Sequence, residues 1–267
     1  MNSPNLWNQI VVWPIVNLLV AFYKLFEFLH IPGPLGFAII LLTIAIRLLL
    51  YPLMQSQLKS AKKMASLKPH LDAINVKHKG DRAKLSQAQM DLYKQHGINP
   101  AAGCLPLLLQ FPVLIGLYSV FAQVLSNGNL EKLIGELNQI LYLPFLKLST
   151  LDLSFFGVNL GIKPSDFQTY GWWLLSVPLI TGALQWYQTK IMMPATTSNT
   201  QLAIIDKKDD KEKKPQDTAA EVQKQMAMIT PIMFGYFAFQ FPLGLALYWN
   251  VFGLFGIMQQ LRVNAQK

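Results

Sequence analysis

The sequence contains a long apolar run with a single charged residue inside it. The run is Phe37–Leu53, FAIILLTIAIRLLLYPL, and its charged residue is Arg47. This length is near the lower limit for a helix that crosses a bilayer, and Leu35 and Gly36 extend it. A guanidinium keeps its proton at physiological pH, so inside a membrane it needs a polar environment. The run therefore predicts a transmembrane helix over residues 35–53 that must accommodate one permanent charge.

Arg47 has two alternative positions in such a helix. Its side chain can extend to the membrane surface and mark the end of the span. Alternatively, it can face a polar cavity inside a bundle of helices, with Thr43 one turn away on the same face. Arg47 lies about 9 Å along the helix axis from the end of the run. At that depth the charge lies inside the apolar layer, and we favour the cavity.

The composition places the chain among membrane proteins. Hydrophobic residues make up 52% of its 267 residues and charged residues 14%, whereas about a quarter of the residues of a soluble domain are charged. The net charge of +9 lies mainly between the apolar runs, as in cytoplasmic loops, so no nucleic-acid substrate is expected. The single cysteine, Cys104, cannot form an internal disulfide. We predict an all-α polytopic membrane protein.

Four further apolar runs predict transmembrane helices. The last two come from one apolar stretch that is too long for a single span, and the sequence Phe241-Pro242-Leu243-Gly244 divides it. With residues 35–53, the expected core has five helices, and the four added spans are residues 104–125, 171–191, 223–241 and 242–261. Polar residues inside these spans include Gln110, Gln185 and Asn250.

Residues 1–34 form an N-terminal segment with a helical stretch over residues 10–29. Its polar residues Gln9, Asn17, Lys24 and Glu27 lie within one narrow arc of the helix. A narrow polar stripe on an aromatic-rich helix is typical of a helix that lies in the membrane interface, and we expect this arrangement. A sixth transmembrane span is the alternative.

Residues 54–100 are strongly basic and show two apolar patterns with helical spacing. Lys79 and Gly80 separate the patterns, Asp81 can cap the second helix, and Gly97 can end it. We expect an antiparallel helical hairpin in the cytoplasm, with most of its lysines simply solvated.

The distribution of Lys and Arg predicts the orientation. Basic residues concentrate in residues 54–100 and in the charged loop 192–222, and the tail 262–267 is also basic. The segment 126–170, which has an amphipathic stripe from Leu130 to Leu141 expected along the membrane surface, carries only three basic residues. Because cytoplasmic loops are enriched in Lys and Arg, the N-terminus is expected outside and the C-terminus in the cytoplasm.

The sequence lacks the usual signs of catalysis. It has no zinc-binding HExxH motif and no phosphate-binding loop, and we expect no enzyme activity, cofactor or metal. None of the five expected spans contains an acidic residue, which disfavours a cation-coupled transporter. A small-solute transporter or channel remains the alternative, and it predicts internal repeats that the sequence does not show. Polar residues such as Gln110 can also simply join helices.

Three motifs resemble those of the YidC/Oxa membrane-protein insertases. They are TIAIRLLLYPL, then NPAAGCLPLLLQFPVLIGLYSVF (residues 99–121), then MITPIMFGYFAFQFPLGLALYWNVFGLFGIMQQ (residues 228–260). The resemblance implies a bacterial plasma-membrane protein. It also implies a groove, open to the cytoplasm and to lipid, through which hydrophobic segments of nascent proteins enter the membrane without ATP. The sequence departs from the Gram-negative members of the family, because we expect no large extracytoplasmic domain before the first span.

The resemblance also implies roles for individual residues. Arg47 becomes the arginine of the groove, and Gln185, Trp249 and Gln110 match its polar positions. With the polar residues identified above, the candidate groove residues are Arg47, Thr43, Gln110, Gln185, Trp249 and Asn250. The hairpin would meet substrates first, through Lys59, Lys62, Lys63, Lys68, Arg82 and Lys84. The implied partners are nascent membrane proteins and the lipid bilayer, with the Sec translocon and the ribosome as further candidates.

Overall fold

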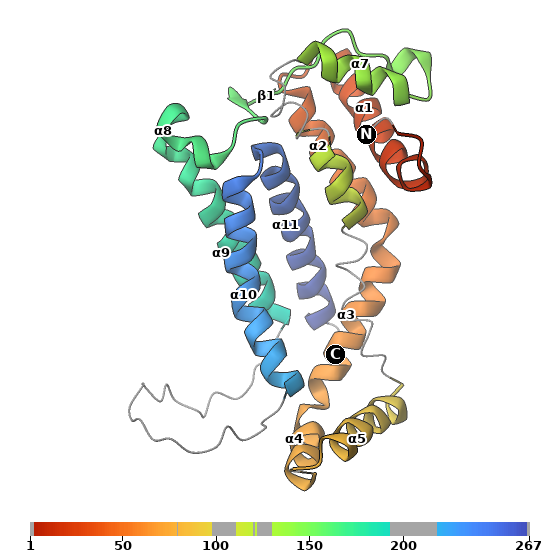
Figure 1. Ribbon diagram of the computed structural model, residues 1–267, viewed down its shortest axis with the longest axis vertical. Coiled ribbons are helices and arrows are strands. Elements are labelled where there is room, and N and C mark those ends of the chain that lie inside the picture. The colour runs from red at the N-terminus through yellow and green to blue at the C-terminus, as the bar shows by residue number, and fades with distance from the viewer. Residues whose placement is uncertain are drawn as a thin grey trace.

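The computed structural model describes residues 3–78, 80–97, 111–119, 121, 130–192 and 218–265. This part of the chain is mostly helical, which confirms the all-α class (Figure 1). The principal helices are α1 (Trp13–Phe28), α2 (Pro34–Leu49), α3 (Tyr51–Ser66), α4 (Lys68–Lys77), α5 (Arg82–Gln95), α7 (Leu130–Ile140), α8 (Phe167–Tyr170), α9 (Ser176–Met192), α10 (Thr218–Gln240) and α11 (Leu243–Ala265). A turn of π-helix, Asn8–Val12, precedes α1, and residues 111–119 are also helical.

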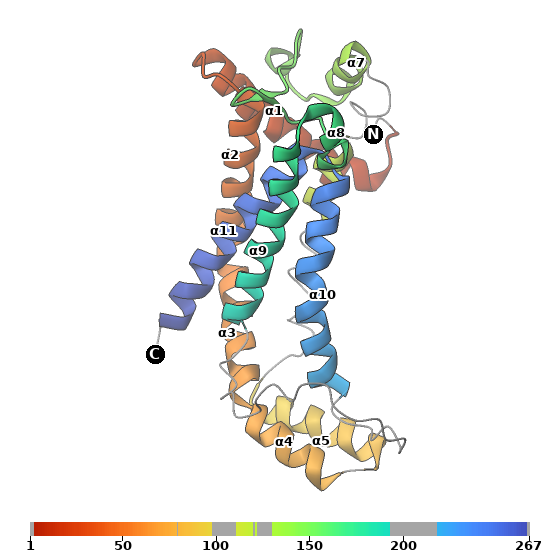
Figure 2. The same ribbon diagram turned by 90° about the vertical axis from the view of Figure 1, so that its left-hand side faces the viewer.

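Helices α9, α10 and α11 lie side by side along the long axis of the molecule, and α2 packs against α11 (Figures 1 and 2). The packing of α9 against α10 depends on two glycines. A Cβ added to Gly235 would lie 3.3 Å from the carbonyl oxygen of Pro178 and 3.8 Å from the Cα of Gly182. Small residues at a helix contact allow the two backbones to approach closely. This contact fixes which face of α9 is turned toward α11.

The expected span 35–53 is not one straight helix. Helix α2 ends at Leu49, and α3 begins at Tyr51 at an angle of 63° to it. Pro52 supplies the physical reason, because a proline has no N–H to donate to the carbonyl four residues earlier. Tyr51 and Leu53 therefore belong to α3, which leads into the charged hairpin.

One helix of the described part, Asn8–Phe28, is long and apolar enough to cross a membrane, and α2 with α3 is a second candidate if the bent pair is one span. Asn8–Phe28 contains the stretch for which we expected an interfacial position. Its polar residue Asn17 is buried, donating hydrogen bonds to the carbonyls of Trp13 and Ile140, both at 2.9 Å, and accepting one from the amide of Tyr142. Asn17 therefore joins α1 to the end of α7.

The apolar stripe of α7 packs against protein. Leu133, Leu137 and Ile140 are each no more than 4% exposed, and they belong to the same core cluster as α1. We expected this stripe to lie along the membrane surface. The difference has a simple cause: an amphipathic pattern identifies an apolar face but not the surface that covers it.

Residues 141–175 close the end of the bundle where α7 lies (Figure 1). They include three short 3-10 helices (Pro144–Leu146, Pro164–Asp166 and Trp172–Leu175) and an antiparallel hairpin of β1 (Ser154–Phe155) and β2 (Val158–Asn159). The ring of Phe155 packs on Gly36, where any added Cβ would overlap it. The carbonyls of Ile162 and Leu160 accept hydrogen bonds, both 2.9 Å, from the amides of Leu243 and Gly244. These bonds satisfy donors that the first turn of a helix leaves free.

The charged hairpin lies at the opposite end of the molecule (Figures 1 and 2). It has a small core of its own around Leu67 and Leu92. Asp81 caps α5 by accepting a hydrogen bond from the backbone amide of Lys84 at 3.1 Å, as predicted. Gly97, just beyond α5, has a φ of 63°, a value that suits a helix-ending glycine.

Helices α10 and α11 both extend beyond the spans expected from hydropathy. Helix α10 begins at Thr218, before residue 223, and α11 ends at Ala265, after residue 261. The added residues mix polar side chains with alanine and valine, and they lie toward the hairpin end of the molecule (Figure 2). The connection between the two helices is tight because Pro242 follows Phe241 directly.

Candidate functional site

Arg47 lies in the last turn of α2 and is 7% exposed. Its Nη2 donates a hydrogen bond to the backbone carbonyl of Phe252 on α11 at 2.5 Å. The guanidinium carbon also lies 3.4 Å from the centre of the Phe252 ring, in a cation–π contact. Nε is buried and has no hydrogen-bond partner among the described residues. The arginine therefore faces the interior between helices, and its hydrogen-bonding capacity is only partly used.

Gly256, one turn after Phe252, leaves the space that Arg47 occupies. A Cβ added to Gly256 would lie 2.9 Å from Nη2 of Arg47 and 2.6 Å from Nε2 of Gln188. Gln188 lies on α9, so residues of α2, α9 and α11 meet at this glycine. Gly253, on the same face of α11, also adjoins Gln188, at 3.7 Å from an added Cβ to its Oε1.

Gln188 was not among the residues selected from the sequence. The sequence placed Gln185 in this role, and the structure leaves Gln185 half-buried on α9, without a described contact to Arg47. The two glutamines are three residues apart, so they occupy neighbouring positions on the helix surface. Choosing between them requires the rotation of α9 about its axis. The Gly182–Gly235 contact sets that rotation, and sequence periodicity alone does not predict it.

Thr43 is fully buried one turn before Arg47, but its hydroxyl is already engaged. Its Oγ1 donates to the carbonyl of Ile39 at 2.7 Å. Such a bond to the preceding turn satisfies a threonine inside a helix without a second partner. The hydroxyl of Thr43 therefore contributes little polarity to the site around Arg47.

Trp249 and Asn250 lie on α11, toward the closed end of the bundle. The ring of Trp249 is 2% exposed and packs against three phenylalanines, Phe234 and Phe237 of α10 and Phe241 just after it, with ring centroids 5.6–6.2 Å apart. Trp249 Nε1 and Asn250 Oδ1 are both buried without a partner in the described part of the chain. Gln110, the remaining candidate, lies outside the described residues.

No carboxylate forms an ion pair with Arg47 within the described ranges, and none lies in α2, α3, α9 or α11. No group of three or more His, Cys, Asp or Glu side chains in these ranges could hold a metal ion. The site thus combines one positive charge with neutral amides, an indole and backbone carbonyls. It can attract an acidic or polar chain, and it contains no pair of groups suited to proton transfer.

A second set of polar contacts joins α3 to the end of α11. Lys62 Nζ donates to the carbonyl of Val263 at 3.2 Å, and Gln259 Nε2 donates to the carbonyl of Tyr51 at 3.4 Å. Of the other hairpin candidates, Lys59 and Lys63 are exposed on α3, and Lys84 is exposed next to Asp81 at 3.1 Å. Lys68 and Arg82 begin α4 and α5, and their side chains lie outside the description.

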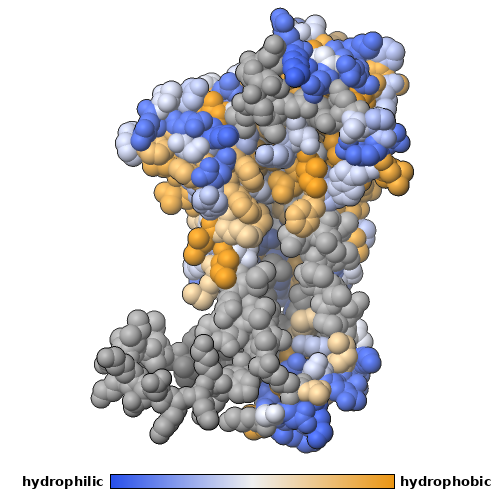
Figure 3. Space-filling model, in the orientation of Figure 1, coloured by the Kyte–Doolittle hydropathy of each residue, from blue (hydrophilic) through white to orange (hydrophobic). Residues whose placement is uncertain are grey.

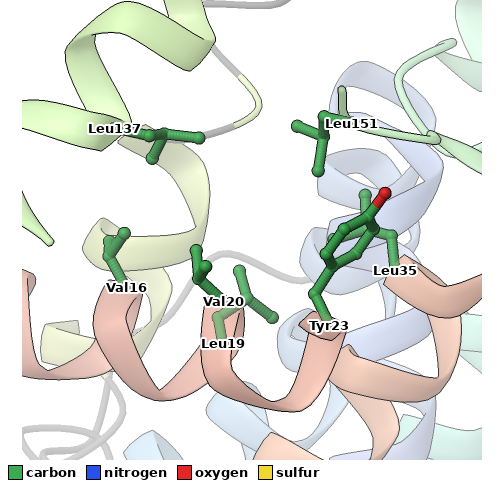
Figure 4. A pocket seen from close by; sticks show the side chains of 7 residues that line it. All are labelled: Val16, Leu19, Val20, Tyr23, Leu35, Leu137 and Leu151. Carbon is green, nitrogen blue, oxygen red and sulfur yellow. The ribbon is translucent and has the colours of Figure 1, made fainter. Parts of the chain in front are cut away.

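A small apolar cavity lies elsewhere, between α1, α2 and α7. Its volume is about 10 Å³, and Val16, Leu137 and Leu151 are among its apolar lining residues (Figure 4). A water molecule needs at least this much space and several polar partners. The cavity is therefore a packing gap in the core and does not belong to the polar site.

The surface of the molecule has an apolar middle zone and two hydrophilic ends (Figure 3). Orange, apolar side chains form the middle zone in Figure 3, and blue, hydrophilic side chains gather at the two ends, over α7 and over the hairpin. Helices α9 and α10 expose large apolar side chains, such as Leu179 at 73% and Ile232 at 75%. The polar cluster around Arg47 therefore lies inside helices whose outer faces are suited to lipid.

Comparison with known proteins identifies the family of the chain. Residues 27–267 match the family model described as "60Kd inner membrane protein". The chain is 32% identical to membrane protein insertase MisCA of Bacillus subtilis, covering 98% of this chain and 81% of that protein. It is also 32% identical to membrane protein insertase YidC of Oceanobacillus iheyensis, covering 98% and 85% of the two chains.

A more distant relative is the chloroplast inner membrane ALBINO3-like protein 1 of Chlamydomonas reinhardtii. It is 30% identical over 91% of this chain, which spans 46% of that protein. The matches thus cover nearly all of the sequence, including α2, α9 and α11 around Arg47. The chain belongs to the 60Kd inner membrane protein family, the YidC/Oxa insertases that its three motifs resemble.

Proposed function

We propose that this protein is a membrane-protein insertase that moves hydrophobic segments of nascent proteins into the plasma membrane through a hydrophilic groove, without ATP. The observation that carries the proposal is Arg47, which is buried between α2 and α11 with a backbone carbonyl as its hydrogen-bond acceptor and with Nε unpaired. A permanent charge is costly inside a membrane and is retained there for a function.

The mechanism follows from the electrostatics of the site. A polar chain that crosses a bilayer must leave water for a medium of low dielectric constant, which costs several kcal/mol for each unpaired polar group. A polar cluster inside the bilayer shortens the low-dielectric distance that the polar chain must cross. The charge of Arg47 attracts an acidic or polar tail more strongly there than it would in bulk water. The apolar segment of the substrate then partitions sideways into lipid.

The proposed topology has five transmembrane helices, with the N-terminus outside and the C-terminus in the cytoplasm. The segregation of the two ends supports it: the hairpin and the end of α11 lie toward one end of the molecule, and α7, the β-hairpin and α8 lie at the other (Figure 2). The basic hairpin would then face the cytoplasm, where it receives substrates, and the residues around Leu160 would close the outer end. Asn8–Phe28 would lie in the outer interface.

Complementation tests the proposal in cells. A bacterial strain depleted of its own insertase should grow when it expresses this protein, and Arg47→Ala should fail to restore growth. Arg47→Lys keeps the charge but loses the planar fork, so partial growth is expected. Arg262→Ala, which removes an exposed arginine from α11, is the matched control and should grow normally. Normal growth with Arg47→Ala would remove the arginine from the mechanism.

A further inference from the structure

A second polar site lies at the junction of α3 and α11, where the chain enters the hairpin. Gln57 on α3 is 7% exposed, and neither its Oε1 nor its Nε2 has a hydrogen-bond partner among the described residues. Gln260 on α11 is 5% exposed, and its Oε1 is likewise unpaired. The Nε2 of Gln260 donates a hydrogen bond to Oδ1 of Asn264 at 2.9 Å. Buried amide groups are nearly always hydrogen-bonded in folded proteins, so the three unpaired amide atoms of Gln57 and Gln260 require an explanation.

The location of these amides follows from the contacts on either side of them. Helix α3 is joined to α11 by the Gln259–Tyr51 hydrogen bond and by the Lys62–Val263 hydrogen bond. Gln57 lies between Tyr51 and Lys62 on α3, as Gln260 lies between Gln259 and Val263 on α11. Both glutamines therefore belong to the α3–α11 junction.

Gln260 is also aligned with the Arg47 site. Trp249, Gly253, Gly256 and Gln260 recur at intervals of four, three and four residues, so they share one face of α11. Gln260 is one turn, about 6 Å, beyond the glycine that contacts Arg47. The face thus carries unpaired polar atoms at Trp249 and Gln260, with Arg47 and Gln188 between them.

We propose that Gln57 and Gln260 bind the polypeptide backbone of a substrate on its way from the hairpin to Arg47. A carboxamide both donates and accepts, which matches the N–H and C=O groups that an extended chain leaves free. Neither residue is charged, so binding would not depend on the side chains of the substrate. An insertase with many substrates needs such a contact. The inference rests on the proposed function.

Proteoliposomes that contain only the purified protein test the site. Gln57→Leu removes unpaired polar atoms at nearly constant volume, so the melting temperature should stay the same or rise. Insertion of a radiolabelled single-span protein should slow about fivefold, the effect of one lost neutral hydrogen bond. Gln260→Leu should slow insertion to a similar extent, but its melting temperature should fall because it also removes the hydrogen bond to Asn264. Gln55→Leu, a half-buried glutamine elsewhere on the same helix turn, is the control and should insert at the wild-type rate.

Contact is tested directly by disulfide formation. In a Cys104→Ser background, Gln57→Cys should crosslink to a cysteine in the polar tail of the substrate while insertion proceeds, and Gln55→Cys should not. A lowered melting temperature in Gln57→Leu would make the amide structural and overturn the site.

Two other outcomes separate this site from the proposed function. Wild-type insertion rates in Gln57→Leu, with slow insertion in Arg47→Ala, would overturn the amide site and leave the groove in place. Failure of the wild-type protein to exceed empty vesicles would overturn the proposed function and this site with it.

Discussion

At the scale of single residues, Gly256 determines whether Arg47 can reach α11. Gly256→Ala places a Cβ 2.9 Å from Arg47 Nη2 and 2.6 Å from Gln188 Nε2, so both side chains must move away. We expect insertion in proteoliposomes to fall several-fold, while the protein remains folded because both polar groups end in flexible chains. Gly135→Ala, where nothing lies within 4 Å of the added Cβ, is the control. An unchanged rate for Gly256→Ala would show that the position of the guanidinium is not critical.

The sequence identified Arg47 but not its neighbours, and the reason is physical. A charge inside an apolar run is visible without a structure, because its cost does not depend on the fold. The choice between Gln185 and Gln188 depends on how α9 is rotated, and the contact between Gly182 and Gly235 decides that rotation. Nothing in the sequence predicted that Gln57 is buried, because a glutamine near a charged segment is expected to be solvated.

At the scale of the elements, apolar runs and Pro or Gly positions located most helices but not their partners. The stripe of α7 was visible in the sequence, yet it packs against α1. The bend between α2 and α3 follows from Pro52, and hydropathy across residues 35–53 conceals it. The Asp81 cap of α5 was predicted correctly, because it depends only on one side chain and the amide three residues later.

The Asp81 cap gives the hairpin a dependence on pH. The Lys84 amide that donates to its carboxylate lowers the pKa of Asp81 from its ordinary value. The cap therefore stabilises α5 fully above that ordinary value, about pH 4, and the contribution is lost as the pH falls through the lower, folded pKa. Hydrogen exchange of α5, corrected for intrinsic rates, should be slow at pH 6 and faster below pH 4.

Two substitutions control for this effect. Asp81→Ala should exchange rapidly at both pH values, because alanine cannot accept the hydrogen bond. Asp81→Asn still caps but does not titrate, so its protection should be the same at both. A pH response in Asp81→Asn equal to that of the wild type would assign the effect to another group.

At the scale of the whole molecule, the two polar ends should lie on opposite sides of the membrane. In a Cys104→Ser background, Gln168→Cys in α8 should react with a membrane-impermeant thiol reagent added to intact cells. Ser86→Cys on α5 should react only after the cells are opened. Both positions are exposed in the structure, so accessibility is set by the membrane alone. Labelling of Ser86→Cys from outside would reverse the topology.

Arg47 is expected to serve insertion and not to support the fold. Its carbonyl bond contributes about 1.5–3 kcal/mol and its contact with the Phe252 ring about 0.5–2 kcal/mol. Burying the charge costs about 2.5–3.5 kcal/mol on insertion scales. These contributions nearly cancel, so Arg47→Ala should fold with a melting temperature close to that of the wild type.

The measurement that tests this most directly is insertion by purified protein in vesicles without nucleotide, using two single-span substrates that differ only in an acidic or a neutral translocated tail. The wild-type protein should insert both. Arg47→Ala, with an unchanged melting temperature, should lose most of its activity on the acidic tail and less on the neutral one. Equal, wild-type rates on both tails would contradict a role for the buried charge in insertion.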